Sequence, residues 1–363
     1  MINTLTSLRI FFALMVFGAH CYVIDSSFDA HFFKEGFVGV SFFFVLSGFI
    51  IAYNYQEKLL EKTATKRTFW VARLARIYPL HLLTLLIAVC IGGYVQYSGT
   101  ADWIKHFAAS TFLLQPFFPS ADYFFSFNSP SWSLGCEQLF YFCFPLIVPF
   151  LHTKRSLFIT LLICLPIMLA GMYLTNEEQI KAYWYVNPFT RLPDFFVGVL
   201  LYQFYRSLCN KKLFYSTGTL LEAGAVALFL LFFLCAADIP KVYRYSCYYW
   251  LPVSLIILIF ALQQGGISRL LSNRILVIGG EISYSFYLIH LFIIDTYMRM
   301  SAHYHWQIQW TISVPVILCI TIILSLLSFY YFEKPANKWV KRIFTKKTII
   351  NQPHGIINKN TAN

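Results

Sequence analysis

Long apolar segments alternate with short polar connections along this chain. A helix needs about 17 to 25 predominantly apolar residues to cross a bilayer. Ten segments reach or approach that length, at roughly 10–24, 37–55, 77–97, 131–151, 156–174, 191–206, 217–236, 247–264, 275–298 and 309–331. The pattern therefore predicts an all-α, polytopic integral membrane protein with about ten transmembrane helices.

Lys and Arg residues are unequally divided between alternate connections. One set of connections carries 21 of the 28 basic residues, and the other carries seven. Because positive residues close to a span are retained in the cytoplasm, we expect both termini there, with 56–76 and 332–363 inside and the aromatic connection 98–130 outside. We divide the chain into a membrane-embedded domain, 1–335, and a basic cytoplasmic tail, 336–363.

Composition supports this interpretation. The chain is 58% hydrophobic and 12% charged, whereas a soluble domain is about half apolar and about a quarter charged. The formal charge of +12 does not indicate nucleic-acid binding, because the basic residues punctuate apolar runs instead of sharing one soluble face. The expected surroundings are the lipids of the inner or plasma membrane. The nine cysteines are scattered singly, so we predict no disulfide framework and no metal site.

Two ionisable residues of the first segment, Arg9 and His20, share one face of the predicted helix. Eleven steps of 100° return to within about 20° of the starting direction, and the rise is about 16 Å. Arg9 would lie at the cytoplasmic edge and His20 outward of the bilayer midplane. A charge inside the bilayer costs at least ~2.5 to 3.5 kcal/mol, which makes such residues functional candidates. Alternatively, both residues are structural: Arg9 anchors the helix at the membrane interface, and His20 packs against neighbouring helices.

The fourth segment places Ser133, Glu137 and Tyr141 on one face, because they recur at i, i+4 and i+8. This segment runs inward, so Glu137 should lie about 9 Å below its outer end, close to the expected depth of His20. A carboxylate and an imidazole at one depth suit a general base and the group that orients it. We predict His20 and Glu137 as catalytic, with Ser133 and Tyr141 as weaker candidates for substrate binding.

Arg73 and Arg76 stand at the cytoplasmic start of the third segment. Their i, i+3 spacing makes them face the same way, and two guanidinium forks suit a phosphate group. Anchoring at the cytoplasmic interface explains the pair equally well.

Other polar residues in the predicted spans carry weaker signals. Arg191 and Asp194 suggest an ion pair at the outer start of the sixth segment, and Arg191 is also a weaker substrate-binding candidate. The remaining residues are assigned structural roles or have no explanation from the pattern: Glu281, Ser283 and His290 in the ninth segment, and Glu222 and Asp295.

Six motifs occur along nearly the whole chain in one order and in a membrane context. They are R-x10-H from Arg9 to His20, the run 39–50, R-x-x-R from Arg73 to Arg76, S-x-x-x-E from Ser133 to Glu137, and the runs 191–198 and 282–290. Together they resemble the acyltransferase-3 family of membrane acyltransferases, which includes O-antigen, capsule and exopolysaccharide acetyltransferases. Gly135, Cys136 and Gln138 depart from the residues more usual at their positions, but the motif residues are intact.

The resemblance implies an enzyme that takes an acyl group, usually acetyl, from cytosolic acyl-CoA and delivers it to a hydroxyl of a cell-surface polysaccharide or lipid-linked glycan outside. It implies His20 as the catalytic histidine, Arg9 and Glu137 as its companions, and Arg73 and Arg76 as CoA contacts. No permanently bound cofactor is expected, since acyl-CoA is a co-substrate. About 30 residues follow the last segment, too few for the soluble hydrolase-like domain of some relatives, so we expect a stand-alone form.

Two alternatives belong to other classes of protein. A transporter or flippase for a glycan or lipid-linked intermediate would also have many spans with buried polar residues, but it would not need acyl-CoA. A membrane sensor or scaffold would leave His20 and Glu137 free to be apolar.

Overall fold

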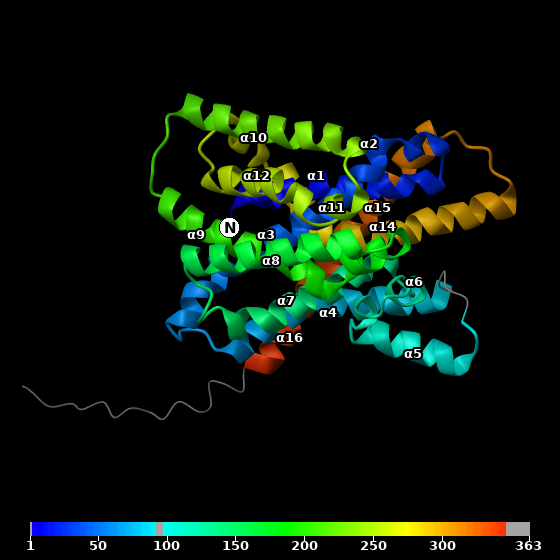
Figure 1. Cartoon of the computed structure of the whole chain (residues 1–363). Helices are drawn as coiled ribbons and strands as arrows, with labels where there is room; N and C mark the ends of the chain where they lie inside the picture. The colour runs from blue at the N-terminus through cyan, green and yellow to red at the C-terminus, as the bar shows by residue number, and fades with distance from the viewer. Residues whose placement is uncertain (1, 92–96, 346–363) are drawn as a thin grey trace, which may run out of the picture.

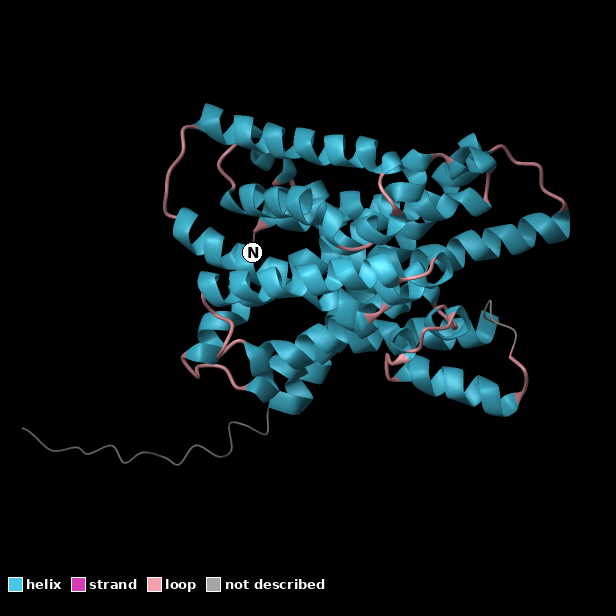
Figure 2. Ribbon diagram, viewed as in Figure 1, coloured by secondary structure: helices cyan, strands magenta, loops and turns pink. Residues whose placement is uncertain are grey.

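The computed structural model describes residues 2–91 and 97–345, and its elements there are all helical, with no strand among them (Figure 2). Within these ranges, seven helical segments are long and apolar enough to cross a membrane: Asn3–Val23, His31–Leu60, Lys66–Ile91, Lys154–Leu174, Tyr215–Asp238, Arg274–Tyr304 and Trp310–Phe344. The prediction of an all-α polytopic membrane protein is confirmed.

Each of the ten predicted segments coincides with a helix. These are α1 (Asn3–His20), α3 (Val38–Leu60), α4 (Lys66–Ile91), α7 (Trp132–Ile147), α8 (Lys154–Leu174), α9 (Pro188–Leu208), α10 (Tyr215–Cys235), α12 (Trp250–Leu262), α14 (Arg274–Tyr304) and α15 (Trp310–Ser328). Three of them are not among the seven long apolar segments. With 16 and 13 residues, α7 and α12 are short, and α9 carries Arg191 and Asp194 near its start. The number of crossings stays a prediction.

Shorter helices fill the connections. They are α2 (His31–Lys34), α5 (Thr100–Thr111), α6 (Ala121–Phe124), α11 (Lys241–Arg244), α13 (Gly266–Leu271) and α16 (Lys334–Thr345). Single 3₁₀ turns occur at Cys21–Val23, Ser26–Asp29, Glu35–Phe37, Gln115–Phe117, Ser129–Ser131, Glu177–Gln179, Ala236–Asp238 and Cys247–Tyr249, and π-helical turns at Lys181–Val186 and Phe329–Glu333. The aromatic connection 98–130 is thus largely helical.

The long helices run side by side in roughly one direction (Figure 1). The connections that follow α3 and α9 lie at one end of the bundle, and the connection that follows α14 lies at the other. This is the alternation from which the basic residues were counted. Which end faces the cytoplasm stays a prediction.

The centre of the bundle is formed by α1, α3, α9 and α14. The segment His31–Leu60 is 72% buried over its most apolar stretch, compared with 22% for α8. Glycines let these central helices approach closely. A Cβ atom at Gly48 of α3 would overlap the carbonyl of Phe195 on α9, and one at Gly280 of α14 would overlap the carbonyl of Thr6 on α1. Small residues allow such backbone contact between membrane helices.

The predicted boundary at residue 335 falls inside a continuous helical segment. After α15 the chain passes through the π-helical turn Phe329–Glu333 directly into α16. The α16 helix then packs against α4, where the side-chain amide of Asn337 donates a hydrogen bond of 2.9 Å to the carbonyl of Ala75. Residues 346–363 of the predicted tail, and 92–96 of the third predicted segment, lie outside the described residues.

Candidate active site

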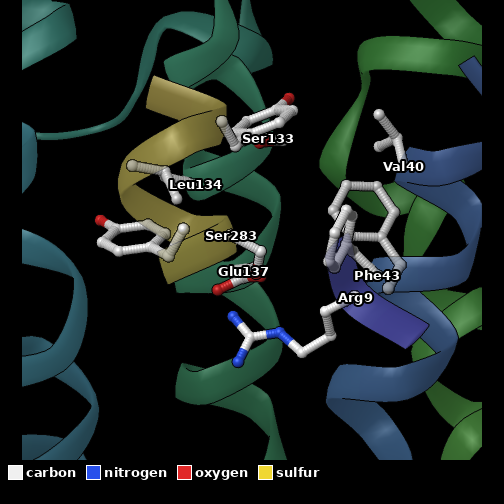
Figure 3. Close-up of a pocket in the computed structure, with 10 residues that line it drawn as sticks. Arg9, Val40, Phe43, Ser133, Leu134, Glu137 and Ser283 are labelled. Carbon is white, nitrogen blue, oxygen red and sulfur yellow. The ribbon is translucent and has the colours of Figure 1, made fainter. Parts of the chain in front are cut away.

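A narrow cavity lies at the centre of the bundle, between α1, α3, α7 and α14 (Figure 3). Its volume of about 60 Å³ holds only a few water-sized groups. Its lining residues are Arg9, Val40, Phe43, Phe44, Ser133, Leu134, Glu137, Ser283, Tyr284 and Tyr287. The structure therefore brings together Arg9, Ser133 and Glu137, three of the residues selected from the sequence. Figure 3 shows the guanidinium group of Arg9 extending toward the carboxylate of Glu137.

The predicted polar face of α7 is present. Ser133 and Glu137 line the cavity, and the hydroxyl of Tyr141, one turn further along, donates a hydrogen bond to Oε2 of Glu137. The hydroxyl of Ser133 donates to the carbonyl of Pro130 at 3.0 Å. Glu137 is thus anchored from its own helix while its carboxylate faces the charge of Arg9.

The residues of α7 that depart from the usual family pattern have local explanations. A Cβ atom at Gly135 would lie 2.5 Å from the side chain of Pro116, so only glycine fits where the 98–130 connection presses against α7. The thiol of Cys136 donates to the carbonyl of Val186 at 3.2 Å. Gln138 accepts a hydrogen bond of 3.2 Å from the hydroxyl of Tyr78 on α4. These contacts shape the scaffold around the cavity.

Arg76 has a carboxylate partner that the sequence analysis did not single out. Its guanidinium forms an ion pair with Glu333, whose side chain is only 3% exposed. Glu333 also accepts a hydrogen bond of 2.8 Å from Ser285, and the guanidinium of Arg76 lies 5.3 Å from the ring centre of Tyr284. Glu333 is 257 positions from Arg76 along the chain. An acidic residue directly after the last apolar run was the only signal that the sequence offered.

Arg73 lies between two aromatic rings. Its guanidinium carbon is 5.2 Å from the ring centre of Tyr55 and 5.9 Å from that of Tyr141. Its Nε is buried and has no hydrogen-bond partner within the described part of the chain. Arg73 and Arg76 both act electrostatically on Glu137. The two arginines therefore belong to the same charged cluster as Glu137 of the cavity.

His20 lies next to His290 on α14. Its Nδ1 is 2.8 Å from the carbonyl oxygen of Val16 and 3.2 Å from Nε2 of His290. The Nδ1 of His290 is in turn 2.7 Å from the carbonyl oxygen of Tyr287, which lines the cavity. The histidine pair thus adjoins the cavity at the Tyr287 end. The pattern of polar residues indicated a structural role for His290, and it gave no sign of this contact between residues that are 270 positions apart.

The expected pairing of His20 with Glu137 is not observed. Among the residues that the structure describes, no hydrogen bond joins the two side chains. Glu137 instead shares the cavity with Arg9. Arg9 and His20 are eleven positions apart on α1, a rise of about 16 Å. Glu137 therefore lies at the depth of Arg9, and the estimate that put it at the depth of His20 is wrong.

The chain that leads into α7 explains this error. Before α7 begins, the side-chain amide of Asn128 donates a hydrogen bond of 3.3 Å to the carbonyl of Leu288 on α14, two residues before His290. The connection has therefore already reached the depth of the histidine pair when α7 starts. A helix that begins so deep places Glu137 further toward the opposite end of the bundle.

A further cation, Lys181, lies near the histidine pair outside the long apolar segments. Its ammonium is 4.6 Å from the ring centre of Phe125, and its charge acts on the ring of His20. Burial lowers the pKa of Lys181, and the charge of Lys241 lowers it further. This end of the site therefore carries a partly desolvated cation that the count of basic residues did not distinguish from the others.

The predicted ion pair of Arg191 and Asp194 is present. It lies behind Phe44, a lining residue of the cavity whose ring centre is 5.0 Å from the guanidinium carbon of Arg191. The side chains of Arg191 and Asp194 are 3.0 Å apart and fully buried. Arg191 also donates to the hydroxyl of Ser41 at 2.8 Å and to the carbonyl of Tyr245, while the indole of Trp250 donates to Asp194. This cluster ties α9 to α3 and α12. The substrate-binding role suggested for Arg191 stays a prediction.

The remaining acidic residues of the predicted spans have structural partners. Glu222 accepts backbone hydrogen bonds of 2.9, 2.9 and 3.1 Å from Gly265, Ile267 and Ser268 at the start of α13, Asp295 pairs with Arg299 at 2.9 Å, and Glu281 pairs with Lys334 at 3.7 Å. Ser283 lines the cavity while its hydroxyl donates to the carbonyl of Gly280 at 2.9 Å. Within the described ranges no group of three His, Cys, Asp or Glu side chains could hold a metal ion.

Comparison with known proteins identifies the family. A family model described as an acyltransferase domain matches residues 2–330. Acyltransferase MdmB of Streptomyces mycarofaciens is 30% identical over 327 residues, which cover 80% of this chain and 78% of the relative. O-acetyltransferase OatA of Staphylococcus aureus is 26% identical over 332 residues, which cover 85% of this chain but only 54% of OatA. This chain thus spans about half the length of OatA. No solved structure matches it.

These comparisons agree with the motifs and with the helical bundle. They favour an enzyme over the transporter and scaffold alternatives, because the family and both relatives are named for acyl transfer. The chain belongs to the acyltransferase-3 family and is a multi-pass membrane acyltransferase.

Proposed function

We propose that this acyltransferase moves an acetyl group from cytosolic acetyl-CoA to a hydroxyl of a cell-surface glycan on the opposite side of the membrane. The observation that carries the proposal is a chain of polar contacts through the bundle. It runs from Arg73 over the ring of Tyr141 to Glu137 and the cavity, and from Tyr287 at the far end of the cavity to His290 and His20. A donor on one side and an acceptor on the other need such a path.

The donor's phosphates are assigned to Arg73 and Arg76. Guanidinium groups bind phosphate through two parallel hydrogen bonds, and Arg73 has a buried donor that no described group satisfies. Arg76 is paired with Glu333. When the donor binds, Arg76 would either release Glu333 or contact Glu333 and a phosphate at the same time. Arg9 and Glu137, which line the cavity, would then contact the arm that carries the thioester.

The acyl group is proposed to be short. The cavity beside Arg9 and Glu137, at about 60 Å³, has room for a two-carbon group. The relative OatA is named an O-acetyltransferase, which supports the same choice and supports a hydroxyl as the acceptor.

His20 is proposed as the general base. Its imidazole would take the proton of the acceptor hydroxyl while the hydroxyl oxygen attacks the thioester carbonyl. When the tetrahedral intermediate collapses, the carbon–sulfur bond breaks and the CoA thiolate receives the proton from the imidazolium. Histidine suits this exchange because its ordinary pKa lies close to neutral pH.

Surface-glycan acyl esters test the proposal. Glycans from cells with the gene, without it, and with a His20→Ala copy would be compared by NMR before and after mild base. Base-labile acetyl signals should be present only with the intact gene. Unchanged acetyl signals in cells without the gene would refute a glycan acceptor. A long-chain ester that is present only with the intact gene would refute acetyl as the transferred group.

A further inference from the structure

We propose that His290 is a positioning residue for His20. Its Nε2 accepts a hydrogen bond from the N–H at Nδ1 of His20 and thereby leaves Nε2 of His20 as the nitrogen that takes the proton of the acceptor hydroxyl. The inference rests on the proposed function, in which His20 is the general base. It assigns to a neutral imidazole the part that a carboxylate plays beside the histidine of many hydrolases.

The hydrogen bonds of His290 determine which of its nitrogens carries the hydrogen. Its Nδ1 lies 2.7 Å from the carbonyl oxygen of Tyr287, and a carbonyl oxygen can only accept. Nδ1 must therefore carry the hydrogen. A neutral imidazole has one N–H and one lone pair, so Nε2 of His290 is an acceptor.

The same reasoning applies to His20. Its Nδ1 lies 2.8 Å from the carbonyl oxygen of Val16 and 3.2 Å from Nε2 of His290. Both neighbours are acceptors, so Nδ1 of His20 must be the donor to them. With the hydrogen on Nε2 instead, the lone pair on Nδ1 of His20 would face the lone pairs of the Val16 carbonyl oxygen and of Nε2 of His290. The lone pair of neutral His20 is therefore on Nε2, where a base needs it.

Packing fixes His290 more firmly than His20. His290 is 1% exposed and stacks on Phe286, with an angle of 7° between the rings. The ring of Phe17 packs against its edge with centres 6.4 Å apart. His20 is only partly buried, so it is the member of the pair that a substrate can reach. His290 stands behind it as a fixed acceptor.

This arrangement also favours the reactive state. When His20 takes a proton on Nε2, its positive charge is shared with the N–H at Nδ1. Hydrogen bonds from a charged donor are roughly twice as strong as those between neutral groups. The lone pair of His290 and the carbonyl of Val16 therefore stabilise the imidazolium that forms during transfer. Glu137 cannot do this because it lies at the depth of Arg9.

Two substitutions test the role in the purified full-length protein. In His290→Gln the side-chain oxygen can still accept a hydrogen bond from His20, whereas His290→Leu removes the acceptor. We expect His290→Leu to lower kcat about 10- to 100-fold with an unchanged KM for acetyl-CoA, and His290→Gln to stay within about threefold of the wild type. A Leu variant with wild-type kcat, or a Gln variant as impaired as the Leu variant, would overturn the proposal.

His81→Leu is the matched control. His81 of α4 is fully buried, and its Nε2 lies 2.8 Å from the carbonyl oxygen of Ser110, so its loss also removes a buried, hydrogen-bonded imidazole. We expect His81→Leu to reduce the amount of folded protein but not kcat per folded molecule. An equal loss of kcat in His81→Leu and His290→Leu would make the effect a general packing defect and refute positioning.

The tautomer can be observed directly and independently of activity. Solid-state NMR of protein labelled with ¹⁵N-histidine should show His20, identified by the signals missing in His20→Gln, with its hydrogen on Nδ1. In His290→Leu this preference should weaken. A hydrogen on Nε2 in the wild type would overturn the inference. Retained transfer by His20→Gln would instead refute the proposed function, while the NMR result would still decide whether His290 orients His20.

Discussion

Arg191 and Arg73 are both arginines set against aromatic rings in one helical bundle, yet their surroundings differ. Arg191 is fully buried, 3.0 Å from Asp194 and 2.8 Å from the hydroxyl of Ser41. Arg73 is partly exposed and lies over the rings of Tyr55 and Tyr141. Each arginine leaves a buried Nε without a hydrogen-bond partner among the described residues, so that feature does not separate them. What separates them is the opposite charge: Arg191 has the carboxylate of Asp194, whereas no carboxylate of the described ranges forms an ion pair with Arg73.

The physical cause is the cost of removing charges from water. A buried pair persists only where each charge is met by the opposite charge and by hydrogen bonds, as around Arg191, which links α9 to α3 and α12. A ligand site has to leave such partners out. Substitutions in the Arg191 cluster should therefore affect folding and spare activity, while substitutions in the site should do the opposite.

The largest effect on activity is expected for His20→Ala. General-base catalysis contributes about 10²- to 10⁴-fold in rate, so transfer in membrane vesicles should fall by that factor at normal protein levels. Protein amount would be normalised by immunoblot and folding checked by gel filtration in detergent. If well-folded His20→Ala kept more than about a tenth of the wild-type rate, histidine would not be the essential base.

Arg191→Met tests the scaffold side of the comparison. It leaves the carboxylate of Asp194 buried without its cation, which typically costs about 3 to 5 kcal/mol. Thermal unfolding followed by gel filtration should show a clear loss of stability. The double variant Arg191→Met with Asp194→Leu should recover much of it. Activity per folded molecule should stay near the wild type, and its loss would instead support a substrate contact at Arg191.

Arg76→Lys tests the donor site with charge retained. An ammonium cannot grip a phosphate with two parallel hydrogen bonds, so we expect CoA affinity in calorimetry to fall about tenfold. Arg206→Lys is the control, because Arg206 is an exposed arginine paired with Glu57 at 2.7 Å. Equal CoA affinity of Arg76→Lys and wild type would make Arg73 and Arg76 interfacial anchors.

Glu222→Gln should give the smallest effect. The amide keeps the shape of the side chain but loses one acceptor at the start of α13, where Glu222 receives three backbone hydrogen bonds. An unsatisfied buried donor costs about 1 to 3 kcal/mol, so the melting temperature should fall modestly and transfer should not change. A strong loss of transfer would assign Glu222 to the active site and contradict the distinction between structural and site charges.

The positions of the helices could be predicted from the sequence. Each of the ten apolar segments is a helix, because a long apolar run in lipid has to satisfy its backbone hydrogen bonds internally. The shared face of Ser133, Glu137 and Tyr141 was also predictable, since helical periodicity is a local property. Arg9, Ser133 and Glu137, each singled out from the sequence, line one cavity, and their functional roles stay predictions.

The depth of each residue and its partner on another helix were decided by the tertiary structure. The sequence put Glu137 beside His20, but the contact of Asn128 with Leu288 lets α7 begin deep in the bundle and moves Glu137 to Arg9. His290 took its place beside His20. Helical periodicity specifies the direction in which a side chain points. It does not specify how far two helices slide along each other, which depends on packing between residues hundreds of positions apart.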